Sequence, residues 1–107
     1  MDKTIKTIWI ESEEEGPING GQINTDDNSD IIVTFSDNTK YVATFFTYDN
    51  VKTLTEKNKK TGELLSGKYF WASDMILVDR IDRETVEKVI DDLIKEKYFD
   101  QLFKRAE

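Results

Sequence analysis

The chain has 107 residues, of which 35% are charged, and a net charge of -7, with no histidine and no cysteine. A chain of this length fits a single domain, residues 1–107, that buries roughly 65% of the surface exposed by the unfolded chain. The absence of cysteine and histidine excludes disulfide bonds, thiolate and imidazole metal ligands and the usual nucleophile and base pairs, so we expect a protein that is not an enzyme and holds no cofactor.

Residues 4–11 are rich in β-branched side chains and include Trp9, a composition that predicts the first strand. Residues 11–21 contain the only proline of the chain, three of its five glycines and four glutamates, which end any strand. We therefore expect a long acidic loop over residues 11–30, within the same domain. Loops of this length in small domains are usually functional or disordered.

Two alternating apolar segments, residues 31–36 and 40–46, predict a β-hairpin around residues 37–39. A three-residue loop keeps the apolar side chains of both strands on one face, whereas a two-residue loop would mix the faces. We favour the three-residue loop. It groups Ile31, Val33 and Phe35 with Tyr41, Ala43 and Phe45.

A helix is expected next, with Thr47 or Asp49 as its N-terminal cap and Gly62 closing its C-terminal end after three lysines. Residues 68–78 follow and form the most apolar part of the chain. Apolar side chains occupy both alternating sets of positions in this segment, which is typical of a central strand that is covered on both faces.

The last predicted helix has the most regular pattern. Asp82 is a suitable N-terminal cap, and Ile81 and Val86 have the spacing of a hydrophobic staple. The apolar side chains that form one buried stripe at helical spacing are Val86, Val89, Ile90, Leu93 and Ile94. The residues that continue this helix or begin a second short one are Tyr98, Phe99, Leu102 and Phe103.

The predicted elements occur in the order βββαβα, which indicates an α+β domain with an antiparallel sheet of about four strands packed by the C-terminal helix. Residues 1–6 lack the apolar core of a signal peptide, and the longest aliphatic run, residues 75–78, is much shorter than a membrane span. We expect a cytoplasmic protein that does not bind membranes.

The negative charge is concentrated at the start of the chain. Residues 1–50 carry ten acidic side chains against three basic ones, whereas residues 51–107 carry twelve of each. No lysine or arginine lies between Lys6 and Lys40, and a field of one sign attracts a cationic protein and repels nucleic acid. The alternative is a solvated loop that only keeps the protein soluble. The candidate partner-binding residues here are Glu13, Glu14, Glu15, Asp26, Asp27, Asp30 and Asp37.

Residues 26–37 also have part of the spacing of a calcium-binding loop, with Asp26, Asn28, Asp30 and Asp37 at ligand positions. Ile31 takes the place of the glycine that such a loop requires, and the residues after it favour a strand. We therefore predict no metal site.

Asp74 lies inside the predicted strand, on the face shared with Ile76. Burial of a carboxylate there costs several kcal/mol unless hydrogen bonds or an opposite charge compensate for it. One explanation is a bulge or a strand end where Asp74 accepts backbone N–H bonds, and the other is a pocket or interface that Asp74 lines with Tyr69 and Trp71. We include Asp74 among the candidate partner-binding residues.

Residues 68–78 read KYFWASDMILV, and residues 82–93 read DRETVEKVIDDL. In these segments the chain resembles the small acidic immunity proteins that are encoded beside bacterial polymorphic toxins, including those of contact-dependent growth inhibition systems. The resemblance covers about the last forty residues and is one of style rather than of a shared motif, so it assigns no site residue. It implies a cytoplasmic protein that binds and blocks a toxic effector domain, often a basic nuclease.

Three functions are therefore considered. The leading one is a non-enzymatic binding protein that neutralises a toxin, a basic nuclease effector domain, through its acidic surface. A related one is a nucleic-acid mimic that blocks a defence nuclease. The third is a small-molecule or metal-binding module, which would need a concave apolar pocket with two acids within reach of each other.

Overall fold

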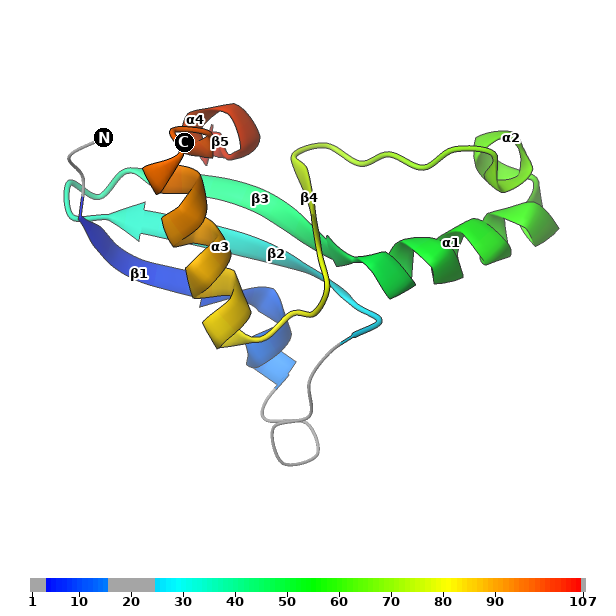
Figure 1. Ribbon diagram of the computed structural model, residues 1–107, viewed down its shortest axis with the longest axis horizontal. Helices are drawn as coiled ribbons and strands as arrows, with labels where there is room; N and C mark the ends of the chain where they lie inside the picture. Colours follow the sequence, from blue (N-terminus) through cyan, green and yellow to red (C-terminus); the bar gives the residue numbers. More distant parts are fainter. Residues whose placement is uncertain (1–3, 16–24, 107) are drawn as a thin grey trace.

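The structure is a computed structural model that describes residues 4–15 and 25–106. Its centre is a sheet in which β1 (Ile5–Ile10), β2 (Asn28–Phe35) and β3 (Lys40–Thr47) are consecutive antiparallel neighbours (Figure 1). β4 (Met75–Val78) and β5 (Lys104–Ala106) share the other edge of β3. β4 pairs with the second half of β3, and β5 pairs with its first half.

The turn between β2 and β3 has a three-residue loop, formed by residues 36–38. The amide of Asn38 donates to the carbonyl of Phe35 at 2.8 Å, and the amide of Phe35 donates to the carbonyl of Thr39 at 2.9 Å. Asn38 has a φ of 68°, a left-handed conformation that asparagine tolerates better than most residues. The loop lies one residue earlier than we expected, so each residue of β2 faces a residue of β3 that is two positions earlier than expected. Side chains two positions apart on a strand point to the same face, and the predicted core face is therefore confirmed.

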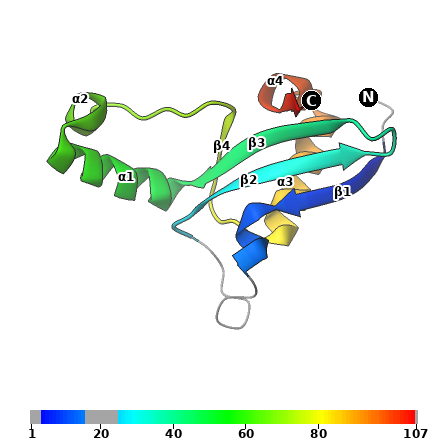
Figure 2. The same ribbon diagram turned by 180° about the vertical axis from the view of Figure 1, so that it is seen from behind.

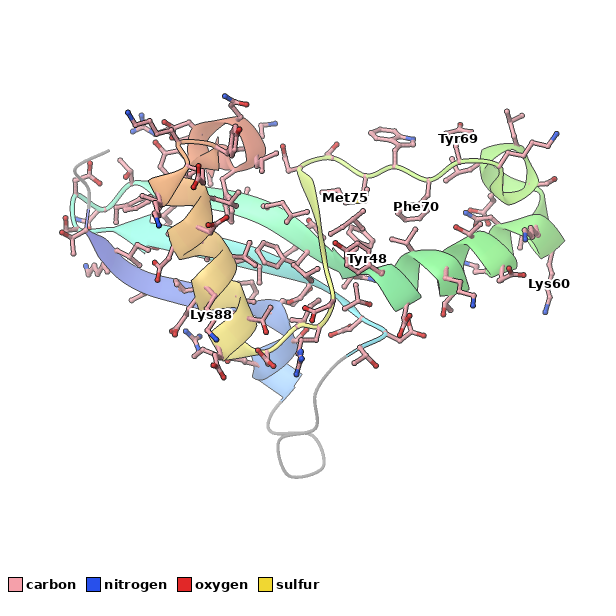
Figure 3. The ribbon with its side chains drawn as sticks, in the orientation of Figure 1. Tyr48, Lys60, Tyr69, Phe70, Met75 and Lys88 are labelled. Atoms are coloured by element: carbon pink, nitrogen blue, oxygen red, sulfur yellow. The ribbon has the colours of Figure 1, made fainter. Side chains whose placement is uncertain are left out.

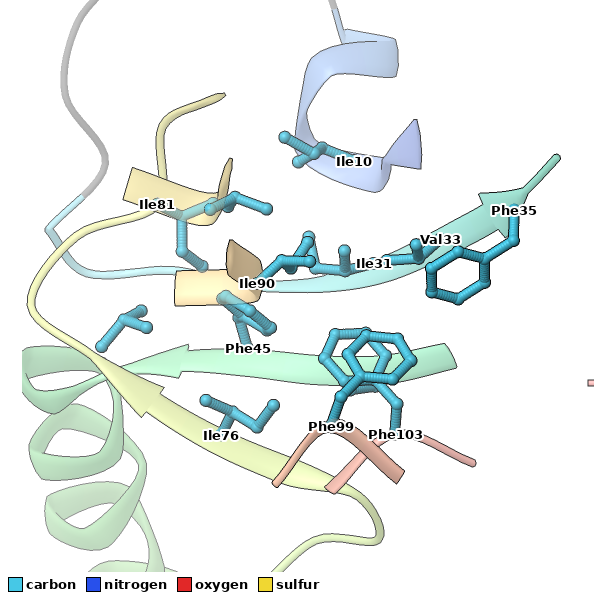
Figure 4. Close-up of a cluster of buried hydrophobic side chains, with 13 residues drawn as sticks. Ile10, Ile31, Val33, Phe35, Phe45, Ile76, Ile81, Ile90, Phe99 and Phe103 are labelled. Atoms are coloured by element: carbon cyan, nitrogen blue, oxygen red, sulfur yellow. The ribbon is translucent and has the colours of Figure 1, made fainter. Parts of the chain in front are cut away.

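Helix α3 (Arg83–Lys95) covers one face of the sheet. Asp82 caps it by accepting a hydrogen bond from the amide of Thr85 at 2.7 Å, as the sequence predicts. Two of its side chains, Val86 and Ile90, are fully buried in the core. The core cluster, shown in Figure 4, consists of Ile10, Ile31, Val33, Phe35, Ala43, Phe45, Ile76, Val78, Ile81, Val86, Ile90, Phe99 and Phe103.

No helix of the described residues lies over the opposite face of the sheet, as Figure 2 shows from behind. On β2, the side chains of Asp30, Ile32 and Thr34 alternate with the core residues and point to this open face, where none of them is buried. Trp9 on β1 pairs with Ile32 and is 38% exposed. The sheet therefore has one covered face and one open face.

Helix α1 (Tyr48–Thr61) begins directly after β3 and extends away from the sheet (Figure 1). The hydroxyl of Thr47 accepts a hydrogen bond from the amide of Asn50 at 3.1 Å and caps the helix. Gly62 ends it with a φ of 86°, so both predicted ends are confirmed. We call α1, the short helix α2 (Glu63–Gly67) and the chain that returns to β4 the arm, residues 48–74.

The tip of the arm is a left-handed turn, because Leu64, Leu65 and Ser66 all have φ values between 50° and 58°. Left-handed backbone costs a residue other than glycine roughly 1–2 kcal/mol. Gly67 lies so close to α1 that an added Cβ would be 2.6 Å from the carbonyl oxygen of Thr55. Glycine at this position allows the turn to pack on the helix.

The prediction of a central strand over residues 68–78 is wrong. Only Met75–Val78 pairs with the sheet, and it forms an edge strand that runs parallel to β3. The parallel direction arises because the chain crosses over through the arm between β3 and β4. The α+β fold class is confirmed, and every other strand pair in the described residues is antiparallel.

The C-terminal residues form a second short helix, one of the two predicted outcomes. Lys97 has a φ of 64° and breaks the chain from α3, after which α4 (Phe99–Leu102) begins. The ring of Phe99 stacks on that of Phe103 with centroids 4.4 Å apart. Phe99 also makes edge contacts with Phe35 and Tyr41, so this short helix completes the core.

Candidate functional site

Four carboxylates lie together where η1 (Glu11–Glu15), the start of β2 and the start of α1 meet. We call this group the acidic end. It consists of Glu11, Asp26, Asp27 and Asp30. Two of the predicted partner-binding residues, Glu14 and Glu15, lie in η1 next to it, but their side chains lie outside the described part. Residues 16–24 of the predicted acidic loop also lie outside it.

The described parts of that predicted loop are more regular than the sequence suggests. Residues 11–15 form the short helix η1, and β2 begins at Asn28, which is three residues before the predicted strand. The amide of Ser12 donates to the hydroxyl of Ser29 at 3.0 Å and so joins η1 to β2. Both sides of the loop are therefore anchored on the sheet.

Asp27 is held by the ends of two other elements. Its carboxylate accepts a hydrogen bond from the hydroxyl of Ser12 at 2.8 Å, and its amide donates to the hydroxyl of Thr47 at 3.0 Å. The same Thr47 hydroxyl caps α1, and Thr47 is completely buried. One threonine therefore fixes the direction of α1 and the position of Asp27 together.

Asp26 is bound by two side chains of the first turns of α1. The amide group of Asn50 donates to it at 3.0 Å, and the hydroxyl of Thr53 donates to it at 2.8 Å. These two hydrogen bonds lower the pKa of the Asp26 carboxyl below its ordinary value, although the carboxyl is exposed. Asn50 also accepts a hydrogen bond from the side chain of Asn28 at 3.0 Å. Asp26 is therefore charged and fixed in position at neutral pH.

Asp30 lies on the open face of the sheet. Its carboxylate accepts a hydrogen bond from the hydroxyl of its cross-strand neighbour Thr44 at 2.9 Å, and its amide donates to the carboxylate of Glu11 at 3.2 Å. Among the residues that the structure describes, Glu11, Asp26 and Asp30 take part in no ion pair. Within the described residues, their charges are thus oriented by neutral groups, and no lysine or arginine forms an ion pair with them.

Glu13, in contrast, already has a cationic partner within the chain. Arg83, at the start of α3, donates to both of its carboxylate oxygens, at 2.7 Å and 3.0 Å. The hydrogen bonds and charge of Glu13 raise the pKa of Arg83 above its ordinary value. The same guanidinium donates to the carbonyl of Ile8 at 2.8 Å. Glu13 is therefore part of a clamp that joins η1, β1 and α3.

Asp37 and Asp74 lie outside the acidic end. Asp37 is at the hairpin tip, at the far end of β2, where it accepts hydrogen bonds from the amide and hydroxyl of Thr39 at 3.0 Å and 2.6 Å. Asp74 is exposed in the turn directly before β4 and has a φ of 53°, so its predicted place inside a strand is wrong and it lies next to a strand end. Its carbonyl accepts a hydrogen bond from the amide of Thr44 at 2.9 Å.

The neutral side chains that organise the acidic end were not among the residues predicted for the site. Ser29, Thr47 and Asn50 are buried polar residues, and each one takes part in the hydrogen bonds described above. The cap signal at Thr47 was visible in the sequence. Nothing in the sequence shows that the same hydroxyl also binds Asp27, because this contact depends on how the chain returns from η1.

The grooves near these residues are polar. One runs beside α1 and is lined mainly by alternating acids and lysines, including Asp26, Asp49, Lys52 and Lys57. Another lies along the outer side of α3. Within residues 4–15 and 25–106, no three acidic side chains are placed to hold a metal ion. Asn28 and Asp30 lie on a strand, which is not the geometry of a calcium-binding loop.

Comparisons with known proteins identify no relative. No family model matches the chain, and neither the curated proteins nor the solved structures contain a match. None of the helices in the described residues combines the length and the apolar composition that a membrane span requires.

Proposed function

We propose that this protein neutralises a toxin by binding to it, that the toxin is a basic nuclease effector domain, and that the acidic end is the binding surface. The observation that supports this most directly is the state of the carboxylates. Glu11, Asp26 and Asp30 are oriented by neutral donors, and no ion pair in the described chain uses them. The resemblance to small acidic immunity proteins supports the same function.

Neutral donors suit a surface that receives cations. They hold each carboxylate in place, which lowers the entropy lost when a partner binds, and they leave its negative charge intact. A lysine or arginine of the partner can then approach without first breaking an ion pair. Close charge pairs across an interface have coupling energies of about 1.5–7 kcal/mol. An acidic surface also accelerates the encounter with a basic protein.

The test compares two triple variants with equal loss of charge. The first is Asp26→Asn, Asp27→Asn and Asp30→Asn, at the acidic end. The control is Asp91→Asn, Asp92→Asn and Asp100→Asn, which are exposed residues of α3 and α4. The partner is the purified product of the gene immediately upstream, and the measurement is its association rate at several salt concentrations.

We expect the acidic-end variant to associate more slowly than the native protein at low salt and to show a weaker salt dependence, because fewer charges steer the encounter. The control variant should lose much less. Equal association rates for all three proteins would contradict the acidic end as the binding surface. Failure of the native protein to protect cells that produce the upstream protein would contradict the neutralising function itself.

A further inference from the structure

The open face of the sheet carries apolar side chains from four strands. Trp9, Ile32 and Val42 lie side by side on β1, β2 and β3, because Ile32 pairs with both of the others. Met75 and Leu77 continue the row on β4, where they alternate with core residues and point to the same face. Trp9 is 38% exposed and Leu77 is 42% exposed. We call these five residues the apolar strip.

Asp30 connects the apolar strip to the acidic end. It lies two positions before Ile32 on the same face of β2, and the hydroxyl of its cross-strand neighbour Thr44 donates to its carboxylate at 2.9 Å. Trp9 is its diagonal neighbour on β1, within the reach of a long side chain. A cation that binds the Asp30 carboxylate therefore approaches over the open face, and the protein that carries this cation covers part of the apolar strip.

The far end of the open face has the opposite charge. Lys40 and Lys104 lie on this face at the hairpin end, since Lys104 pairs with Val42 and Lys40 is two positions before Val42 on β3. Both lysines are exposed, and no ion pair among the described residues uses them. A basic partner is attracted at Asp30 and repelled by the two lysines. Charge therefore places such a partner over the half of the face that adjoins the acidic end.

The arm borders the open face on another side. Phe46 lies on this face opposite Leu77, but the ring of Phe70 packs against it with centroids 5.5 Å apart, and Phe46 is only 8% exposed. Figure 3 shows Phe70 on the returning part of the arm, with its side chain toward α1. The chain thus covers Phe46 itself and leaves the apolar strip beside it in contact with solvent.

We propose that the apolar strip is the part of the toxin-binding surface that holds the complex together, with a lysine or arginine of the toxin on Asp30 and apolar toxin side chains around it. This inference rests on the proposed function and adds the chemistry of the surface that the toxin presents. The acidic end then determines how fast the two proteins meet, and the apolar strip determines how slowly they separate. Trp9 is the expected anchor, because tryptophan is enriched among the residues that dominate binding energy.

The two tryptophans of the chain provide a matched test. Trp9→Thr removes the indole from the apolar strip, and Trp71→Thr removes one from the arm, where Trp71 is 63% exposed. Neither substitution changes the charge, and threonine is well accepted in a strand. The partner is the purified product of the gene immediately upstream, and the measurement is the rate of dissociation at physiological salt. Trp9→Thr should dissociate about tenfold faster or more, with a similar association rate, and Trp71→Thr should dissociate like the native protein.

Fluorine NMR gives a second readout that keeps the apolar strip intact. With 5-fluorotryptophan incorporated into this chain alone, the spectrum contains one signal for each tryptophan, and Trp71→Phe assigns them. Addition of the unlabelled partner should shift or broaden the Trp9 signal and leave the Trp71 signal nearly unchanged. This result does not depend on whether Trp9→Thr folds, which thermal unfolding checks separately.

The possible results separate this inference from the proposed function. Native-like dissociation of Trp9→Thr and an unchanged Trp9 signal, together with slower association of the acidic-end variant, would overturn the inference and leave the function standing. A Trp9 signal that changes with the concentration of this chain alone would show that a second copy occupies the apolar strip, which also excludes the inference. Absence of any binding between the native protein and the upstream product would contradict the proposed function, and the inference with it.

Discussion

At the scale of single residues, Arg83 joins α3 to β1 and η1, which lie 70 or more residues earlier in the chain. Its guanidinium binds Glu13 of η1, the carbonyl of Ile8 on the edge strand β1 and, at 3.5 Å, the carboxylate of Glu87. Strand edges with open carbonyl groups are sites where other chains can pair. Arg83 therefore holds the N-terminal strand and also occupies part of its free edge.

Replacing Arg83 by methionine should lower the free energy of unfolding by about 1 kcal/mol, since the ion pair is exposed but the bond to Ile8 is also lost. Chemical denaturation measures the change. Lys88→Met is the control, because Lys88 pairs with Glu84 at 3.0 Å and both side chains are more than three-quarters exposed. It should change the stability by less than about 0.5 kcal/mol. Equal effects of the two substitutions would contradict the clamp.

Asp26 gives a pH-dependent contribution to stability. Hydrogen bonds from Asn50 and Thr53 lower its pKa in the folded state, so its contribution is complete above its ordinary pKa of about 4 and is lost as the pH falls through the lowered value. We expect the thermal unfolding midpoints of the native protein and of Asp26→Asn to differ at neutral pH and to converge in acid. A difference that is the same at both pH values would show that the hydrogen bonds do not favour the charged form.

At the scale of elements, the short helix α4 contributes more to the core than its length suggests. Phe99 is 1% exposed and contacts the rings of Phe35, Tyr41 and Phe103. Phe99→Ala should destabilise the protein by about 3–5 kcal/mol. The neighbouring Tyr98 is 53% exposed, and Tyr98→Ala should cost less than about 0.5 kcal/mol. Similar unfolding curves for the two variants would show that α4 does not seal the core.

Elements whose signals are local were predicted from the sequence. The caps at Thr47 and Asp82, the end of α1 at Gly62 and the core stripe of α3 all depend on residues within a few positions of one another. The direction and length of β4 could not be predicted in this way. Its apolar pattern is the same in a central strand and in an edge strand, and only the path of the arm decides which is formed.

The candidate site was predicted to a smaller extent, for the same reason. Charge counting identified Asp26, Asp27 and Asp30, and the structure brings these three together. Charge counting could not distinguish these three residues from Glu13, which forms an ion pair with Arg83 of α3, or from Asp37, which lies in the hairpin turn. Pairing between distant residues is a property of the folded chain.

At the scale of the whole molecule, the sheet with α3 and α4 forms a body that holds most of the core, and the arm projects from it. Of the residues in the arm, only Asn50 and Asn58 are buried. Segments with few buried contacts open at low free-energy cost. The arm should therefore be the least stable part of the described chain.

Hydrogen exchange at low protein concentration measures this difference. Amides of residues 69–73 should exchange near the rate of an unstructured chain, and the paired amides of β2 and β3 should exchange slowest. Strong protection of residues 69–73 would contradict the low stability of the arm.

We expect the edge of β3 that β4 and β5 share to set the order in which the strands pair during folding. β1, β2 and β3 are neighbours in sequence, whereas β5 must close a loop of about sixty residues to reach Lys40, Tyr41 and Val42. The three-stranded meander should therefore form in the folding transition state, with β5 docking afterwards. In stopped-flow experiments, Ile31→Val should mainly slow refolding and Phe103→Leu should mainly accelerate unfolding. The opposite assignment would place the nucleus at the C-terminal end.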